Sequence, residues 1–286
     1  MKQNLLTSVL VATDFSLGAQ HALDRALRLP LHPEGELTVV HVIPRDIPGE
    51  LRMQALRDAG DRLATLVTAR AALAKAEGLQ PGQINVDVLE GAPAKQLSKR
   101  ARAVEAELIV VGRHGRRAIA DVFVGTTAQK VLRLGEVPLL LVQLDPTVAY
   151  ERVLVGVALE SGSSRVLKAS RFLAPEASVE AFHASHVPFE DYVALSGELA
   201  TTYRQQSVGD ASSELEELVA KNGLEATCVV KAGDPRPVLL EEAKAFGAQL
   251  LVLGSHGKKG LERLVLGSVA EWVATHASTD VLVIRT

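Results

Sequence analysis

The sequence LIVVGRHGRRAIADVFVGTT at residues 108–127 returns as LLVLGSHGKKGLERLVLGSV at residues 250–269. Each copy is an aliphatic run, a glycine, two residues, a second glycine, nine residues, and a third glycine followed by Thr or Ser. Short aliphatic runs that end in glycine are typical of buried parallel strands. Because this order recurs 142 residues later, we expect two copies of one α/β unit.

The repeat extends beyond these strings. Gly91 and Gly233 each follow an apolar run and keep the spacing of 142 residues. The first aliphatic runs, 9–12 and 153–156, are instead 144 residues apart. We place the two additional residues of the first copy in a turn around residues 30–35, because turns tolerate insertions and deletions.

Each unit alternates short aliphatic runs with amphipathic stretches, which is the pattern of a doubly wound parallel sheet. The units are predicted at residues 1–145 and 149–286, joined by a short linker. Strands are expected at 8–13, 37–43, 84–89, 107–111, 138–143, 152–157, 178–183, 226–231, 249–253 and 280–284. Helices of the first unit are expected at 16–29, 49–77, 92–104 and 118–133. Such sheets bind ligands beyond the carboxyl ends of their strands, where the repeated glycines lie.

The glycine pattern suits a phosphate-binding loop. Glycines after a strand let the backbone approach a ligand closely. The helix that follows offers unpaired N–H groups and a partial positive charge. Thr126 and Ser268 stand at the starts of these helices, where a hydroxyl can cap the helix or contact a phosphate oxygen. The loop is no Walker A motif, because Lys258 and Lys259 are not followed by Ser or Thr.

Occurring twice at equivalent places, this string resembles the ATP-binding signature of universal stress proteins. The chain resembles a tandem, UspA-like member of that family over essentially its whole length. The resemblance implies two tandem five-stranded parallel-sheet α/β domains of the Rossmann-like (HUP) type. It also implies adenine-nucleotide binding and a role in stress tolerance rather than in metabolism.

The resemblance further implies which residues hold the nucleotide. Asp14, at the end of the first strand, would contact the nucleoside, and the backbone of Val42 would hold adenine. The expected cofactor-binding residues are Thr13, Asp14, Val42, Gly112, Arg113, Gly115, Gly125, Thr126, Thr127, Ala184, Gly254, Ser255, Gly257, Gly267, Ser268 and Val269. The expected ligand is ATP, or ADP or AMP, with or without Mg²⁺. We expect no catalytic residue and no resident metal ion.

The second unit departs from the pattern at the nucleoside end. Ala158 aligns with Asp14, so the carboxylate is lost, although Glu160 follows two residues later and can substitute for it. A carboxylate hydrogen bond contributes about 1.5–3 kcal/mol, so its loss would weaken binding by roughly tenfold to a hundredfold. We therefore expect nucleotide to favour the first unit. His41 and His183 are repeat-mates and are expected near the mouth of the site or at a strand end.

Composition and charge exclude several other classes of protein. The net charge is −3, and a basic face typical of nucleic-acid binding is absent from the sequence. Only one cysteine is present, so no disulfide framework can form within the chain. We see no secretory leader and no apolar run long enough to span a membrane. The chain is accordingly expected in the cytoplasm, with neither nucleic acid nor membrane as a partner.

The leading hypothesis is an ATP-binding stress protein whose nucleotide biases binding to an unidentified protein partner. One alternative is a slow ATPase, or an enzyme that phosphorylates itself on Thr126, Thr127 or Ser268. Phosphoryl transfer usually needs a positioned nucleophile and metal-binding carboxylates, and the carboxylate of Asp14 is expected at the nucleoside end. Another alternative is a protein that binds partners without nucleotide.

The last strand of each unit, near 138–143 and 280–284, would form an exposed sheet edge. Such edges need cover. In universal stress proteins these strands pair across a dimer. We therefore predict that the two units pair with each other as an intramolecular pseudo-dimer, and that two chains can associate further as a homodimer.

Overall fold

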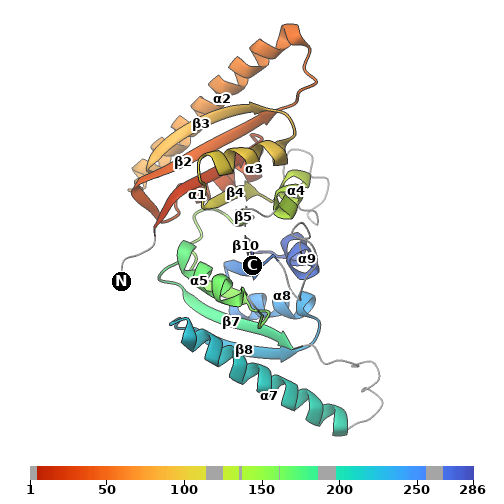
Figure 1. The fold of residues 1–286 in the computed structure, drawn as a ribbon. Coiled ribbons are helices and arrows are strands. Elements are labelled where there is room, and N and C mark those ends of the chain that lie inside the picture. Colours follow the sequence, from red (N-terminus) through yellow and green to blue (C-terminus); the bar gives the residue numbers. More distant parts are fainter. Residues whose placement is uncertain (1–4, 114–124, 135–136, 161, 186–197, 256–266) are drawn as a thin grey trace.

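The computed structural model describes residues 5–113, 125–134, 137–160, 162–185, 198–255 and 267–286. Two α/β units lie side by side and meet at their last strands (Figure 1). The first unit comprises β1 (Leu6–Thr13), α1 (Leu17–Ala26), β2 (Leu31–Ile43), α2 (Gly49–Ala76), β3 (Gln83–Glu90), α3 (Pro93–Ala103), β4 (Leu108–Gly112), α4 (Thr126–Leu134) and β5 (Leu139–Val142). The second comprises β6 (Arg152–Gly156), α5 (Ser163–Leu173), β7 (Ser178–Ser185), α7 (Glu198–Lys221), β8 (Thr227–Ala232), α8 (Pro235–Phe246), β9 (Leu250–Gly254), α9 (Ser268–His276) and β10 (Asp280–Ile284).

One continuous ten-stranded sheet runs through both units in the order β3-β2-β1-β4-β5-β10-β9-β6-β7-β8. Strand pairs within each unit are parallel, whereas β5 and β10 pair antiparallel, with Leu140 opposite Leu282. Both units have the same strand order. The switch point, where the strand order reverses, lies between β1 and β4 in the first unit and between β6 and β9 in the second. The predicted fold class and the intramolecular pairing of the last strands are confirmed.

Each face of the sheet is covered by helices from both units. Helices α1, α2, α5 and α7 bury residues such as Leu23, Leu63 and Leu215 on one face. The opposite face is covered by α3, α4, α8 and α9, through residues such as Leu97 and Val273. The strands need aliphatic residues in continuous runs because both of their faces are buried. In Figure 1 the long helices α2 and α7 lie at the two outer ends of the molecule, beside the edge strands β3 and β8.

Strand β2 differs from the prediction. It begins at Leu31, so residues expected in a turn belong to the strand. Leu6 pairs with Leu31 and Ser8 pairs with Glu36, which leaves the additional residues in an irregularity of the β1–β2 ladder. A Cβ at Gly35 would lie 2.9 Å from the carbonyl oxygen of His32, so glycine suits this close approach. The extra residues of the first unit thus extend a strand instead of lengthening a turn.

Helix α4 also begins later than predicted. The expected helix started at residue 118, but residues 118–124 lie outside the described ranges, and α4 begins at Thr126.

None of the helices within the described ranges is both long and apolar enough to cross a membrane.

A buried polar cluster joins the two units beside the β5–β10 pair. Asp280 of β10 accepts hydrogen bonds from the side chain of Arg25 in α1 at 3.1 Å and from the hydroxyl of Tyr150 at 2.5 Å. Its other oxygen accepts the backbone N–H groups of Gln143 at 2.7 Å and Leu144 at 2.8 Å. Both charged side chains are almost fully buried. Because Arg25 and Asp280 come from different units, this cluster fixes the units against each other.

Candidate functional site

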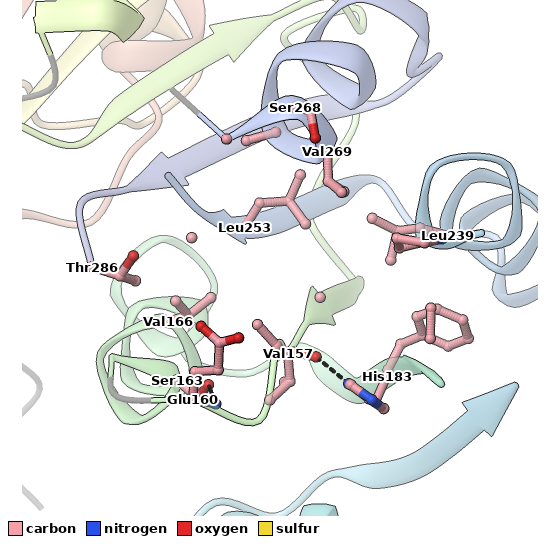
Figure 2. Close-up of a pocket in the computed structure, with 18 residues that line it drawn as sticks. Val157, Glu160, Ser163, Val166, His183, Leu239, Leu253, Ser268, Val269 and Thr286 are labelled. Carbon is pink, nitrogen blue, oxygen red and sulfur yellow. Dashed lines mark hydrogen bonds between the residues drawn. The ribbon is translucent and has the colours of Figure 1, made fainter. Parts of the chain in front are cut away.

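The described residues form a cavity of about 500 Å³ at the switch point of the second unit. The strand order reverses between the neighbouring strands β6 and β9, and the cavity lies beyond their carboxyl ends. Figure 2 shows the lining side chains around it. Doubly wound sheets place their ligands at this position.

The cavity has mainly apolar walls with a few polar groups. The apolar side chains come from Val157, Val166, Phe182, Leu239, Leu253 and Val269. The polar side chains come from Glu160, Ser163, His183, Ser268 and Thr286. This composition is typical of small-molecule sites, where apolar walls hold a ring and a few polar groups fix its orientation.

Each glycine loop is closed at its base by a backbone hydrogen bond. The N–H of Gly267 donates to the carbonyl of Ser255 at 2.6 Å, and the N–H of Gly125 donates to the carbonyl of Arg113 at 2.8 Å. The two bonds are equivalent, so both units hold the start of the following helix against the end of the preceding strand. Gly115, His114, Gly257 and His256, which the sequence placed in these loops, lie outside the described residues.

Helix α9 directs its N-terminus at the cavity. Gly267 precedes its first residue and supplies no side-chain cap. Ser268 and Val269 of its first turn line the cavity. The first N–H groups of a helix lack intrahelical partners and carry partial positive charge, so this end of the cavity favours an anion.

Each unit has a histidine whose ring makes the same hydrogen bond to the backbone. Nδ1 of His183 lies 2.7 Å from the carbonyl oxygen of Val157, and Nδ1 of His41 lies 2.8 Å from that of Thr13. A carbonyl only accepts hydrogen bonds, so Nδ1 carries the hydrogen in both rings. His183 lines the cavity, and Figure 2 shows its bond to Val157. His183 therefore lies near the end of β7 and beside this cavity.

The turn after the first strand of each unit has a shared backbone path. Phe15 has a φ of 65° and its equivalent Leu159 has a φ of 55°. In the first unit, Asp14 Oδ1 accepts the N–H of Ser16 at 3.0 Å. In the second, the N–H of Glu160 donates to Ser163 Oγ at 3.1 Å. The turn therefore persists where Asp14 is replaced by alanine.

The space beside the first glycine of the signature differs between the units. A Cβ at Gly112 would lie 2.4 Å from the backbone of Gly18, so α1 packs directly on the end of β4. A Cβ at Gly254 would instead meet the side chains of Thr286 at 2.9 Å and Val166 at 3.3 Å. Gly162, the equivalent of Gly18, precedes α5 and has a φ of 111°. The later start of α5 leaves side chains, rather than helix backbone, beside Gly254.

The other first-unit residues meet at the same edge of their half of the sheet. Thr13 and Asp14 end β1, Val42 lies near the end of β2, and Gly112 ends β4. Gly125, Thr126 and Thr127 stand at the start of α4. Thr13 Oγ1 accepts the N–H of Phe15 at 3.0 Å, and the Phe15 ring lies 4.4 Å from the His41 ring, centroid to centroid. The topology thus brings the described members of the predicted set together.

Arg113 differs from its predicted role at the phosphate loop. Its side chain is buried, and its guanidinium donates to the carbonyl oxygens of Thr275 and Ala277 in the second unit and to the side chain of Gln143. These carbonyls lie at the C-terminal end of α9, where a positive charge is favourable. Arg113 is therefore an interface residue that caps α9. Its repeat-mate Ser255 is also buried, and its backbone N–H donates to Ile284 at 2.7 Å.

Sequence reasoning missed several lining residues. Ala184, Gly254, Gly267, Ser268 and Val269 were predicted and line the cavity. Phe182 and Leu253 could have been found, because they lie close to the ends of predicted strands. Leu239 comes from the middle of α8, and no sequence signal distinguishes it from other core leucines.

The profile of the universal stress protein family matches residues 6–143 and 149–285. The chain belongs to the universal stress protein family. Its two units are tandem universal stress protein domains. A universal stress protein of Mycolicibacterium smegmatis is 27% identical, covering 97% of this chain and 96% of the relative. Universal stress protein A homolog 2 of Coxiella burnetii is 32% identical, covering 48% of this chain and 95% of that protein.

Solved structures agree on the fold. A universal stress protein from Archaeoglobus fulgidus superposes with a TM-score of 0.72 at 18% identity, covering 97% of this chain and 96% of that one. The likeness extends over both tandem domains, so the arrangement of two universal stress protein units in one chain is shared.

Proposed function

We propose that this universal stress protein binds an adenine nucleotide in the cavity of its second unit. One observation carries the proposal. The cavity combines apolar walls, against which an aromatic ring can pack, with the N-terminus of α9, which has no side-chain cap. The signature residues Gly254, Gly267 and Ser268 line the same space. Membership of the universal stress protein family and these cavity residues together support an adenine nucleotide as the ligand.

The apolar end suits the adenine ring. Phe182, Leu239 and Leu253 offer carbon surface, and ring burial against such side chains is a main source of affinity in small-molecule sites. Ala184, the repeat-mate of Val42, places backbone groups beside this surface, where they can meet the polar edge of adenine. A volume of about 500 Å³ falls within the range of about 300–1,000 Å³ usual for such ligands.

The other end suits phosphate or sugar oxygens. The first turn of α9 supplies backbone N–H groups, and the Ser268 hydroxyl stands beside them. Both are neutral donors, so they bind an anion without a buried positive side chain. In this proposal the nucleotide acts as a signal that biases partner binding during stress in the cytoplasm, with Mg²⁺ as the counter-ion of the phosphates in solution.

Self-phosphorylation is the second candidate, because the Ser268 hydroxyl lies at the edge of the cavity, where a γ-phosphate would arrive. Mass spectrometry after incubation with ATP and Mg²⁺ separates the two. One stoichiometric phosphate on Ser268 would indicate an enzyme, whereas an unmodified chain with saturable ATP binding would indicate a binding protein.

The proposed function is tested by calorimetric titration of adenosine, AMP, ADP and ATP into the full chain. We expect saturable binding that Ser268→Ala weakens about two- to tenfold, because one neutral hydrogen bond contributes about 0.5–1.5 kcal/mol. Thr126→Ala, the equivalent change in the first unit, is the matched control and should leave this binding unchanged. Absence of binding by all four ligands would refute the proposal.

A further inference from the structure

The second unit has a carboxylate where the first has none. Glu160 lines the cavity, and Figure 2 shows its side chain beside Val166 and Ser163. The equivalent residue of the first unit is Ser16, whose hydroxyl accepts the N–H of Ala19 at 3.2 Å and caps α1. The two units therefore have different side chains, a hydroxyl and a carboxylate, just before the equivalent helices α1 and α5.

The backbone N–H and carbonyl groups of Glu160 both form hydrogen bonds with Ser163. Its N–H donates to Ser163 Oγ at 3.1 Å, and its carbonyl accepts the N–H of Ser163 at 3.1 Å. Its carboxylate accepts no hydrogen bond and forms no ion pair with any residue of the described ranges. A carboxylate beside an apolar cavity without a partner gains most from a ligand that donates hydrogen bonds.

The carboxylate lies on the side of the cavity lined by Val166 and Thr286, across from Ser268. In Figure 2 Glu160 lies near Val166 and Thr286, whereas His183 and Leu239 lie at the opposite end. Val166 and Thr286 are also the side chains closest to Gly254, the first signature glycine. A negative charge on this side of the cavity repels phosphate oxygens bound at the start of α9, and the repulsion is stronger in a partly apolar cavity than in water.

We propose that Glu160 sets the specificity of the second unit: it accepts hydrogen bonds from ligand hydroxyl groups and lowers the affinity for the triphosphate relative to that for the nucleoside. This inference rests on the proposed function, because it concerns the same cavity. The first unit, with Asp14 at the strand end and Ser16 at the helix entrance, lacks this selection against phosphate.

Trp272 provides a signal that belongs to the second unit. It is the only tryptophan in the sequence, and it lies on α9, one turn after Ser268. It packs against the hydrophobic cluster and stacks on His276 with ring centroids 4.2 Å apart. Its fluorescence therefore reports on α9, whose first turn lines the cavity of the second unit.

The test is a fluorescence titration of the full chain with adenosine and with ATP, each in EDTA and in Mg²⁺. In EDTA we expect the ratio of adenosine affinity to ATP affinity to be about tenfold higher in wild type than in Glu160→Gln. Glu160→Gln should raise the ATP affinity by about tenfold and change the adenosine affinity much less. Glu160→Ser, which introduces the first-unit side chain, should act in the same direction. Glu176→Gln, which removes an exposed charge from the same unit, is the control.

The outcomes separate this inference from the proposed function. If neither adenosine nor ATP binds to wild type or variants, the proposed function fails. If both bind but their affinity ratio is the same in Glu160→Gln and wild type, Glu160 does not set specificity. If the variant weakens ATP binding only in Mg²⁺, the carboxylate is a metal ligand, and the inference is wrong.

Discussion

Asp14 and Ala158 occupy the same place in two turns of the same shape, yet only Asp14 carries a carboxylate. The Asp14 carboxylate receives the N–H of Ser16 and so contributes to the turn itself. In the second unit the Ser163 hydroxyl receives the N–H of Glu160 instead. Because the second turn forms without the aspartate, residue 158 is free to vary for binding, and its side chain is exposed.

Ala158→Asp should therefore strengthen nucleoside binding in the second unit. A carboxylate there adds a hydrogen-bond acceptor for a ribose hydroxyl, which contributes about 1.5–3 kcal/mol and corresponds to about tenfold to a hundredfold in affinity. Trp272 fluorescence measures the change with adenosine. The reciprocal substitution in the first unit, Asp14→Ala, is the control and should leave the adenosine affinity measured by Trp272 fluorescence unaltered. An unchanged or weaker adenosine affinity in Ala158→Asp would contradict this role.

At the scale of elements, β7 and α8 form one wall of the cavity and also enclose an acidic pair. Glu180 of β7 is buried, and its Oε1 has no hydrogen-bond partner within the described residues. Burial, with the neighbouring Glu242 of α8, raises the pKa of Glu180 from 4.5 to about 7, against the opposing effect of Lys231. Lys231 of β8 pairs with Glu242. Protonation of Glu180 therefore relieves an unfavourable contact between β7 and α8.

This pair predicts a pH dependence of stability. The unfolded state releases the Glu180 proton near pH 4.5, whereas the folded state retains it up to about pH 7. The free energy of unfolding should therefore fall as the pH rises from about 4.5 to about 7. Glu180→Gln should remove this component, so its urea midpoint should exceed that of wild type increasingly towards pH 7.5. Parallel pH profiles for the variant and wild type would show that Glu180 is not the group responsible.

At the scale of the whole molecule, the two units behave as halves of one sheet. The β5–β10 pair continues the backbone ladder between them. Glu271 of α9 accepts hydrogen bonds from Gln129 and Arg133 of α4, each at 2.8 Å, and Arg113 caps the C-terminal end of α9. Helix α9, whose N-terminus lies at the cavity of the second unit, is thus held in place by residues of the first.

The Arg25–Asp280 pair should be the main polar determinant of this union. Asp280→Asn removes one charge and leaves Arg25 buried without its counter-ion, which costs about 3–5 kcal/mol in comparable buried pairs. Arg133→Gln breaks the pair with Glu271, which is partly exposed, and should cost less than about 1 kcal/mol. Urea denaturation of the full chain measures both. Equal small losses for the two variants would contradict the central role of Asp280.

The fold could be predicted from the sequence because its strands are uninterrupted aliphatic runs that end at repeated glycines. The pairing of the units was predicted for a related reason, since two apolar edge strands need cover. Arg113 was misjudged because its partners Thr275 and Ala277 lie more than 150 residues away and contribute only backbone carbonyls. Leu239 and Val166 could not be assigned to the cavity, since helical core residues look alike until helix positions are known.

The packing beside the first signature glycine of each unit also could not be predicted. The position of a helix start decides whether helix backbone or side chains lie beside that glycine, at Gly112 and Gly254 respectively. Gly18 and Gly162 are the same residue type at equivalent positions, and only the structure shows that one lies within a helix and the other precedes it.

We propose that the second unit holds an adenine ligand between β6, β9 and the start of α9. A crystal structure of the full chain grown with adenosine, and a second with AMP, tests it most directly. We expect density for the ring against Phe182 and Leu239, with the ribose close to Glu160. Density in the first unit alone, or an empty second cavity at saturating ligand, would contradict it.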